Sequence, residues 1–175
     1  MTARLAGPDG QYGAGRRTVA TGAVRCSVRC VAVHWSDDTT ITPAPPLSDE
    51  RLAEIQDRLG VRLPADYVDV VRSHQGAAPD RTSVTLPDGT GTPFSMLLHL
   101  EDQPGCLNVL ETVEWSEIVP DKVIPFAIDA GGNYFCFDYR STTTDPPVVF
   151  LAHDDPDAQP ERISGSFTEL IDSLR

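Results

Sequence analysis

The chain has 175 residues, a formal net charge of −12 at pH 7 and four cysteines. A chain of this length fits one domain that can bury a core without disulfides, and Cys26, Cys30, Cys106 and Cys136 form no C-x-x-C pair of the kind found in zinc knuckles and redox motifs. Residues 41–175 hold nine basic and 23 acidic side chains, so this part repels phosphate backbones, which excludes nucleic acid as the expected ligand and favours basic proteins.

The first 46 residues predict a flexible or weakly ordered extension that ends in a proline-rich linker. Residues 1–22 are rich in Gly, Ala, Arg and Thr and show no sustained apolar period, and 24–35 predict at most one strand. Arginines interrupt the region where a secretory segment would be apolar, and no apolar run approaches the ~20 residues of a membrane span. We therefore expect a cytoplasmic protein without membrane association, whose domain occupies residues 47–175.

Two short helices open this domain. Ser48 is a typical N-cap, and Leu52, Ile55 and Leu59 recur at helical spacing before Gly60 stops the first helix. A second helix is expected from Pro64 to Gly76, because proline is tolerated in a first helical turn.

Strands dominate the rest of the chain. The strongest prediction is a hairpin of 123–128 and 134–139, joined at a Gly131-Gly132-Asn133 turn that permits positive φ. Alternation in the second strand, with Phe135, Phe137 and Tyr139 on one side, indicates a sheet buried on at least one face. Further strands are expected at 83–86, 95–100 and 148–151, a short helix around 107–113, and a last helix capped by Ser166 and Glu169.

This order of elements lacks regular β-α alternation. It therefore predicts an α+β fold, a single domain with a largely antiparallel sheet flanked by helices.

The sequence offers no catalytic or metal-binding motif. Neither a G-x-S-x-G elbow nor a phosphate-binding glycine loop is present, and the four histidines lie in different predicted segments. Asp129, Gly132 and Asn133 could in principle hold a cation or polar ligand, but a hairpin turn in which Asp129 or Asn133 caps backbone amides explains them without one. We expect no enzyme activity, no cofactor and no metal.

Acidic residues are the remaining candidates for binding a partner. Glu101 and Asp102 form one cluster, Glu111, Glu114 and Glu117 a second, and a proline-bracketed loop carries the third. Loop side chains are free to meet a partner, although solvated surface charge is the simpler explanation. The candidate partner-binding residues are Glu101, Asp102, Asp154, Asp155 and Asp157.

Two segments about sixty residues apart carry a resemblance to a known family. The first is Leu63-Pro64-Ala65-Asp66-Tyr67, followed by Gly76 in a turn, and the second runs from Ile124-Pro125 through Asp129, Gly132 and Asn133 to Tyr139. In this order, and with a closing helix at Ser166-Phe167, they resemble the SUKH superfamily, which includes a fungal cell-wall assembly regulator and many bacterial toxin-immunity proteins. The motif residues with an expected structural role are Leu63, Pro64, Tyr67, Gly76, Pro125, Asp129, Gly132 and Asn133.

The resemblance implies a binding protein of the same α+β architecture, covering about residues 47–174. The leading expectation is an immunity protein that binds a cognate toxin domain encoded nearby, a basic one if the acidic surface steers the encounter. The alternative is a regulatory or scaffolding module that docks onto another cellular protein.

Overall fold

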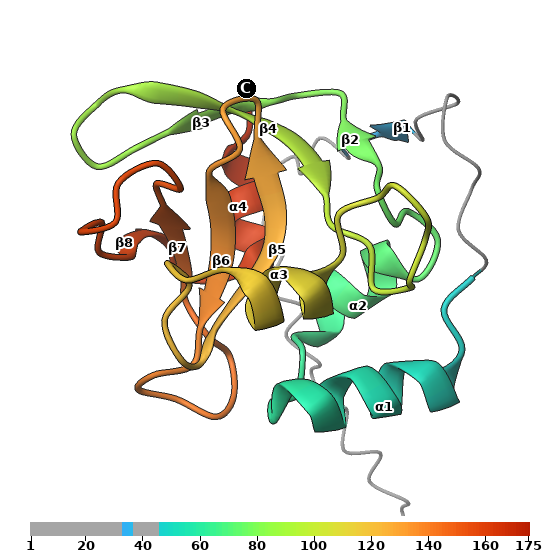
Figure 1. Ribbon diagram of the computed structural model, residues 1–175. Coiled ribbons are helices and arrows are strands. Elements are labelled where there is room, and N and C mark those ends of the chain that lie inside the picture. Colours follow the sequence, from blue (N-terminus) through green and yellow to red (C-terminus); the bar gives the residue numbers. More distant parts are fainter. Residues whose placement is uncertain (1–32, 37–45) are drawn as a thin grey trace, which may run out of the picture.

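The computed structural model describes residues 33–36 and 46–175. The centre of this part of the chain is a six-stranded antiparallel sheet in which each strand lies beside its sequence neighbours (Figure 1). This confirms the expected α+β fold with an antiparallel sheet. The strands are β3 (Ser83–Thr85), β4 (Gly91–Leu97), β5 (Val123–Asp129), β6 (Tyr134–Asp138), β7 (Val148–Leu151) and β8 (Glu161–Ser164).

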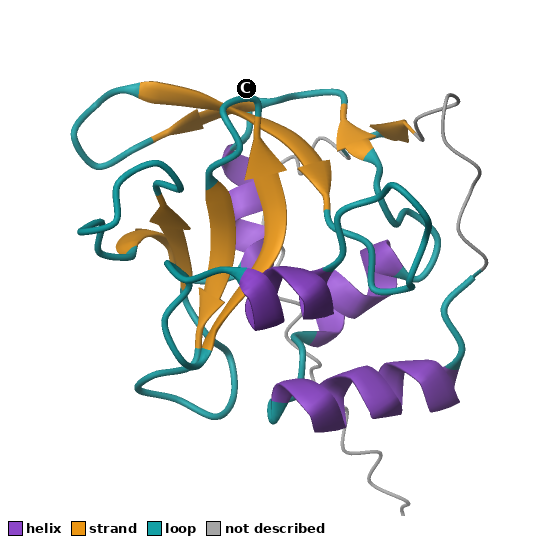
Figure 2. Ribbon diagram, viewed as in Figure 1, coloured by secondary structure: helices purple, strands orange, loops and turns teal. Residues whose placement is uncertain are grey.

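Four helices accompany the sheet in the described residues: α1 (Asp49–Leu59), α2 (Ala65–Val71), α3 (Val109–Trp115) and α4 (Phe167–Ser173). Figure 2 shows α4 behind β5 and β6, α3 in front of the lower sheet, and α1 and α2 together at one side.

Local signals set the limits of the first two helices. The Ser48 hydroxyl accepts a hydrogen bond from the Arg51 amide, and Gly60 ends α1 with φ +67°, as its C-cap position predicts. The second helix is shorter than expected, because it ends at Val71 rather than near Gly76. After Arg72 the amides of Ser73 and His74 both donate to the Val70 carbonyl, which closes a tight turn in place of another helical turn.

Helices α2 and α4 pack on one sheet face through a cluster of aromatic rings. Tyr67 on α2 is fully buried, and its ring centroid lies 5.6 Å from Phe126, 5.2 Å from Phe137 and 5.4 Å from Phe167, each edge-on. Phe126 and Phe137 stack across neighbouring strands at 4.2 Å. Edge-to-face and offset stacks are the preferred geometries of aromatic pairs. Tyr67, from the Leu63–Tyr67 segment, therefore lies at the centre of the core.

The opposite sheet face is also covered. Val123, Cys136, Val149 and Leu151 form a second buried cluster there, against which Val119 and Ala158 pack. The alternation predicted for β6 is therefore correct, and the sheet is buried on both sides in this region.

Several boundaries differ from the sequence prediction. The second strand of the sheet was expected at 95–100, but β4 begins at Gly91, where 91–93 pair with β3, and ends at Leu97. The following residues leave the ladder while staying buried, and Leu98 donates its amide to the Phe126 carbonyl. The edge strand β8 was not predicted, because half-exposed Glu161-Arg162-Ile163-Ser164 has no apolar period.

A short strand precedes the expected domain boundary. β1 (Trp35–Ser36) pairs antiparallel with β2 (Ala78–Pro79), and the Trp35 ring lies edge-on to Phe94 at 6.2 Å. The rest of the strand expected at 24–35 lies, apart from residues 33 and 34, outside the described residues.

The last helix has a modified capping box. The Ser166 hydroxyl accepts from the Glu169 amide as expected, but the Glu169 carboxylate accepts from the Gly165 amide instead of the Ser166 amide. The Asp66 carboxylate adds bonds from the amide and hydroxyl of Thr168. Asp66 therefore ties the start of α2 to the start of α4.

Candidate functional site

The β5–β6 turn is organised around one buried carboxylate. Oδ1 of Asp129 accepts from the amides of Gly131 and Asn133, and Oδ2 accepts from the Thr92 hydroxyl and the Asn133 side-chain amide. Burial alone would raise the pKa of Asp129, but these hydrogen bonds outweigh it and leave the pKa below its usual range. Gly132 has φ +88°. Both oxygens are thus satisfied within the chain, and the hairpin accounts for Asp129 without a bound cation.

Asn133 also connects this turn to the acidic loop. Its Oδ1 accepts from the backbone amide of His153 at 3.0 Å. The start of the loop between β7 and β8 is therefore held by the hairpin turn.

The turn after α2 holds the segment that leads into Glu101. Gln75 accepts the amides of Leu100 and Glu101 through its side-chain oxygen, at 2.8 and 2.9 Å. Gly76 has φ +74°, and a Cβ there would lie 2.3 Å from Nε2 of His99. Position 76 therefore requires glycine both for its backbone angle and for space. The preceding Gln75 contributes to the turn by accepting the two amides with its side chain.

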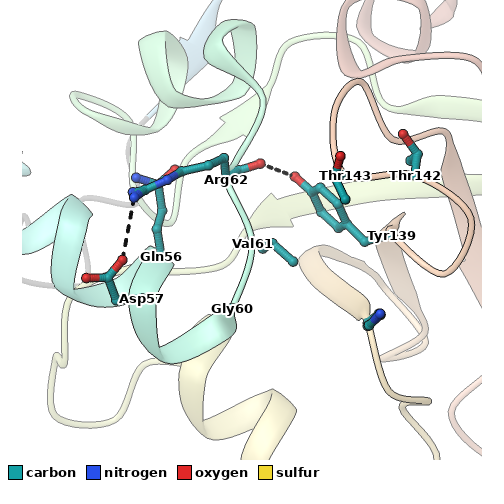
Figure 3. Close-up of a pocket in the computed structure, with 9 residues that line it drawn as sticks. Gln56, Asp57, Gly60, Val61, Arg62, Tyr139, Thr142 and Thr143 are labelled. Atoms are coloured by element: carbon teal, nitrogen blue, oxygen red, sulfur yellow. Dashed lines mark hydrogen bonds and ion pairs between the residues drawn. The ribbon is translucent and has the colours of Figure 1, made fainter.

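A cavity of about 470 Å³ opens between the end of α1 and the end of β6 (Figure 3). The Tyr139 hydroxyl donates to the Arg62 carbonyl at 2.5 Å, and Arg62 lies 3.6 Å from Asp57. Lys122 and two threonines complete the polar lining. None of these lining residues pairs a nucleophile with a base, so this cavity offers no hydrolytic constellation.

The structure separates the acidic candidates into two places. Glu101 is mostly buried and pairs with Arg51 on α1 at 3.2 Å, whereas its neighbour Asp102 is exposed. Asp154, Asp155 and Asp157 are exposed in the β7–β8 loop, which lies on the left of Figure 1, far from the β4–α3 loop on the right. Glu101 is thus committed to an internal ion pair, while the other four carboxylates face solvent.

The acidic loop has internal order despite its exposure. Asp155 caps the amide of Asp157, and Ala158 packs onto the second core cluster. Asp154 and Asp157 have no ion-pair partner in the described part of the chain. These carboxylates are held on a defined loop and remain available for a partner.

The surface between α1 and α3 brings Asp102 and Glu111, which belong to the acidic clusters noted in the sequence, together with Trp115, which sequence reasoning missed. We call it the α1–α3 surface; it surrounds a cavity of about 200 Å³ and includes Arg51, Arg58, Leu100, Asp102, Asn108, Leu110, Glu111, Glu114 and Trp115. Trp115, the last residue of α3, is 74% exposed, and Leu107, just before α3, is 53% exposed. The signal that could have revealed Trp115 was its failure to fit the apolar period of the predicted helix.

The α1–α3 surface is shaped by ion pairs. Arg51 bonds to Glu54 and Glu101, and Arg58 pairs with Glu114 from α3. The Asn108 side chain caps α3 by accepting the Glu111 amide. One exposed ion pair, Arg58–Glu114, thus links the two helices, and the charges of both arginines are already compensated.

In the described part of the chain, no helix is both long and apolar enough to cross a membrane. In the same residues, no group of three or more His, Cys, Asp or Glu side chains is placed to hold a metal ion.

Comparison with known proteins places the chain in a family. No match was found among the curated proteins. A family model does match residues 46–173, a span that contains α1, the sheet and α4. The chain therefore belongs to the SMI1 / KNR4 family (SUKH-1).

Proposed function

We propose that this protein is a non-catalytic immunity protein that binds a cognate bacterial toxin domain and blocks its active site or substrate channel. The observation that carries the proposal is the family membership over residues 46–173, since the SUKH resemblance implies toxin-immunity proteins. Neither described cavity combines a nucleophile with a base, which is compatible with a binding role.

Charge gives the proposal a physical rationale. The net charge is −12, and Asp154 and Asp157 of the β7–β8 loop form no ion pair with the described residues. A basic nuclease domain would be steered towards such a surface, and a standard interface of about 1,200–2,000 Å² would be sufficient for stable binding. The proposed partner is a basic toxin domain encoded nearby, and the proposed location of the complex is the cytoplasm.

The test uses the C-terminal domain of a long secreted protein encoded beside this gene. Co-expression of the unmodified protein should restore growth of cells that produce this domain, and the purified pair should associate faster at low salt than at high salt. If the pair neither binds nor restores growth, the immunity proposal is wrong. The regulatory alternative would then be favoured, with docking onto a cellular protein as its test.

The acidic loop can be tested in the same system. Replacing Asp154, Asp155 and Asp157 with Asn should slow association by about 3–10-fold at low salt and reduce the salt slope, with a smaller change in dissociation. The matched control removes three exposed carboxylates elsewhere, at Glu50, Asp69 and Asp121. Equal effects of the two triple variants would show that only total charge matters and would remove the loop from the interface.

A further inference from the structure

The exposed apolar side chains of the described residues gather at the two ends of α3. Trp115 and Leu107 are the large hydrophobic residues with most of their surface in solvent, at 74% and 53%. Exposed single apolar residues are ordinary, but tryptophan is enriched among the residues that dominate binding energy at protein interfaces. Its location beside a cavity distinguishes Trp115 from a scattered surface residue.

The cavity beside Trp115 offers both apolar and acidic groups. Leu100 and Leu110 line it, although each is almost fully buried, and most of the accessible apolar area beside it belongs to Trp115, while Asp102 and Glu111 contribute carboxylates. No ion-pair partner of either carboxylate occurs among the described residues. A cationic side chain with an aliphatic stem fits this combination, because the stem packs on apolar atoms while the charge reaches the carboxylates.

The cations of this surface do not oppose such a ligand. Arg51 is engaged by Glu54 and Glu101, and Arg58 by Glu114. The lining residues and their ion-pair partners include five acidic residues and two basic ones. The local charge is therefore negative, as is the charge of the whole chain, which disfavours docking of a second copy.

The Trp115 ring supplies a further contact for a cation. A guanidinium or ammonium group over an indole face is attracted by the ring quadrupole. The same ring can cover the stem of the side chain, and Leu107 provides apolar area at the other end of α3. Helix α3 and the loop before it thus present an aromatic anchor at Trp115, two acids without an ion pair among the described residues, and an exposed apolar side chain at Leu107.

We propose that the α1–α3 surface is the docking site for a basic segment of the protein partner, in which an Arg or Lys beside an apolar residue packs on Trp115 and pairs with Asp102 and Glu111. This rests on the proposed function only for the identity of the partner as a toxin domain. The β7–β8 loop is a separate steering element. The segment after Trp115, through Val119, and the loop, through Ala158, pack against the same buried cluster.

The first experiment measures binding of the neighbouring toxin domain to purified variants of the full chain. Trp115→Ala should weaken binding by about 30-fold or more, mainly through faster dissociation. The double variant Asp102→Asn, Glu111→Gln should slow association by about 3–10-fold and reduce its salt dependence. Asp69→Asn, an exposed change on α2, is the control and should leave both rates nearly unchanged.

These outcomes separate the two proposals. If the unmodified protein binds the toxin domain and Trp115→Ala binds equally well, the docking site is wrong while the immunity function stands. If the unmodified protein does not bind that domain, the immunity function is wrong, and the docking site is decided by a second probe.

The second probe is a random-peptide library selected on the immobilised full chain. Support would be peptides in which Arg or Lys adjoins an apolar residue, with binding lost in Trp115→Ala and retained in Asp69→Asn. Acidic peptides, peptides indifferent to Trp115→Ala, or no selected peptide would overturn the proposal. Self-association that depends on Trp115, measured by sedimentation, would also overturn it, because a second copy would then occupy the surface.

Discussion

Two buried tyrosines should respond in opposite directions to the same substitution. Tyr67 is fully buried and its hydroxyl has no hydrogen-bond partner among the described residues, whereas the Tyr139 hydroxyl donates to the Arg62 carbonyl. Burial raises the pKa of both hydroxyls above the usual range, with Tyr139 adding to the effect on Tyr67. Both groups therefore stay neutral at ordinary pH, and only their hydrogen bonding differs.

Replacing each tyrosine with phenylalanine isolates the hydroxyl. At Tyr67 the three edge-on ring contacts are kept, and the desolvation penalty of an unpaired polar group, about 1–3 kcal/mol, is removed. The small void left by the oxygen offsets part of this gain. We therefore expect the free energy of unfolding of Tyr67→Phe to be unchanged or raised by up to about 2 kcal/mol.

Tyr139→Phe should have the reverse effect. It removes the donor from the Arg62 carbonyl, so the free energy of unfolding should fall by about 1 kcal/mol. Tyr67→Ala sets the scale for the ring itself: loss of a fully buried aromatic side chain should cost about 3–5 kcal/mol. A loss of this size in Tyr67→Ala would show that Tyr67 stabilises the fold through the packing of its ring.

Urea unfolding followed by far-UV circular dichroism measures all three variants. The dependence on urea concentration should be the same in each, so that midpoints report stability. A loss of about 1 kcal/mol or more in Tyr67→Phe would refute the reasoning, because it would mean that the hydroxyl makes a stabilising hydrogen bond in solution.

Other predictions concern the turn, the buried histidine and the N-terminal strand. Hydrogen bonds lower the pKa of Asp129 in the folded state. Its stabilising contribution is therefore fully present above the unfolded pKa of about 3.9, and it is lost as pH falls from that value through the lower folded pKa. Asp129→Asn should lower the free energy of unfolding by about 2–3 kcal/mol at pH 7. The unfolding midpoint of this variant should depend less on pH in the acid range than that of the unmodified protein. An unchanged dependence would contradict a stabilising role for the Asp129 carboxylate. Burial lowers the pKa of His99, whose ring nitrogens lack partners in the described residues, so stability should begin to fall below about pH 6.5. In His99→Leu the fall in stability that begins below about pH 6.5 should be absent. If the variant still shows this fall, another group is responsible for it. Gly132→Val should cost about 1–3 kcal/mol because φ is +88°, and a variant of normal stability that fails to bind a partner would make the turn a binding site. Deleting residues 1–40 should leave a folded domain, but one less stable by about 1–3 kcal/mol through loss of the Trp35 contact with Phe94; insoluble expression would show that the segment is an essential part of the core.

Sequence alone determined the features that depend on neighbouring residues. Ser48 and Gly60 mark the ends of α1, Ser166 caps α4, and alternation in Tyr134–Tyr139 identifies a strand with a buried face. Each of these signals acts within a few residues, through a hydrogen bond, a backbone angle or a side-chain period. The acidity of the domain is likewise readable without a structure, because it depends only on composition.

Only the tertiary structure decided what depends on contacts between distant segments. β8 has no apolar period of its own and is a strand because Val148, Val149 and Phe150 pair with it. Glu101 reads as a surface acid in the sequence, yet Arg51, fifty residues earlier, engages it in a mostly buried ion pair.

Trp115 is the clearest case of this dependence on tertiary structure. An aromatic residue at the end of an amphipathic helix is ordinarily assigned to the core, and the only sequence signal against this at Trp115 is its failure to fit the apolar period of the helix. Within α3, Val109, Leu110 and Thr112 are buried, whereas Glu114 and Trp115 at the other end are exposed. The side chain that we propose as the binding anchor was therefore visible in the sequence, but its exposure to solvent is set by how α3 packs on the rest of the fold.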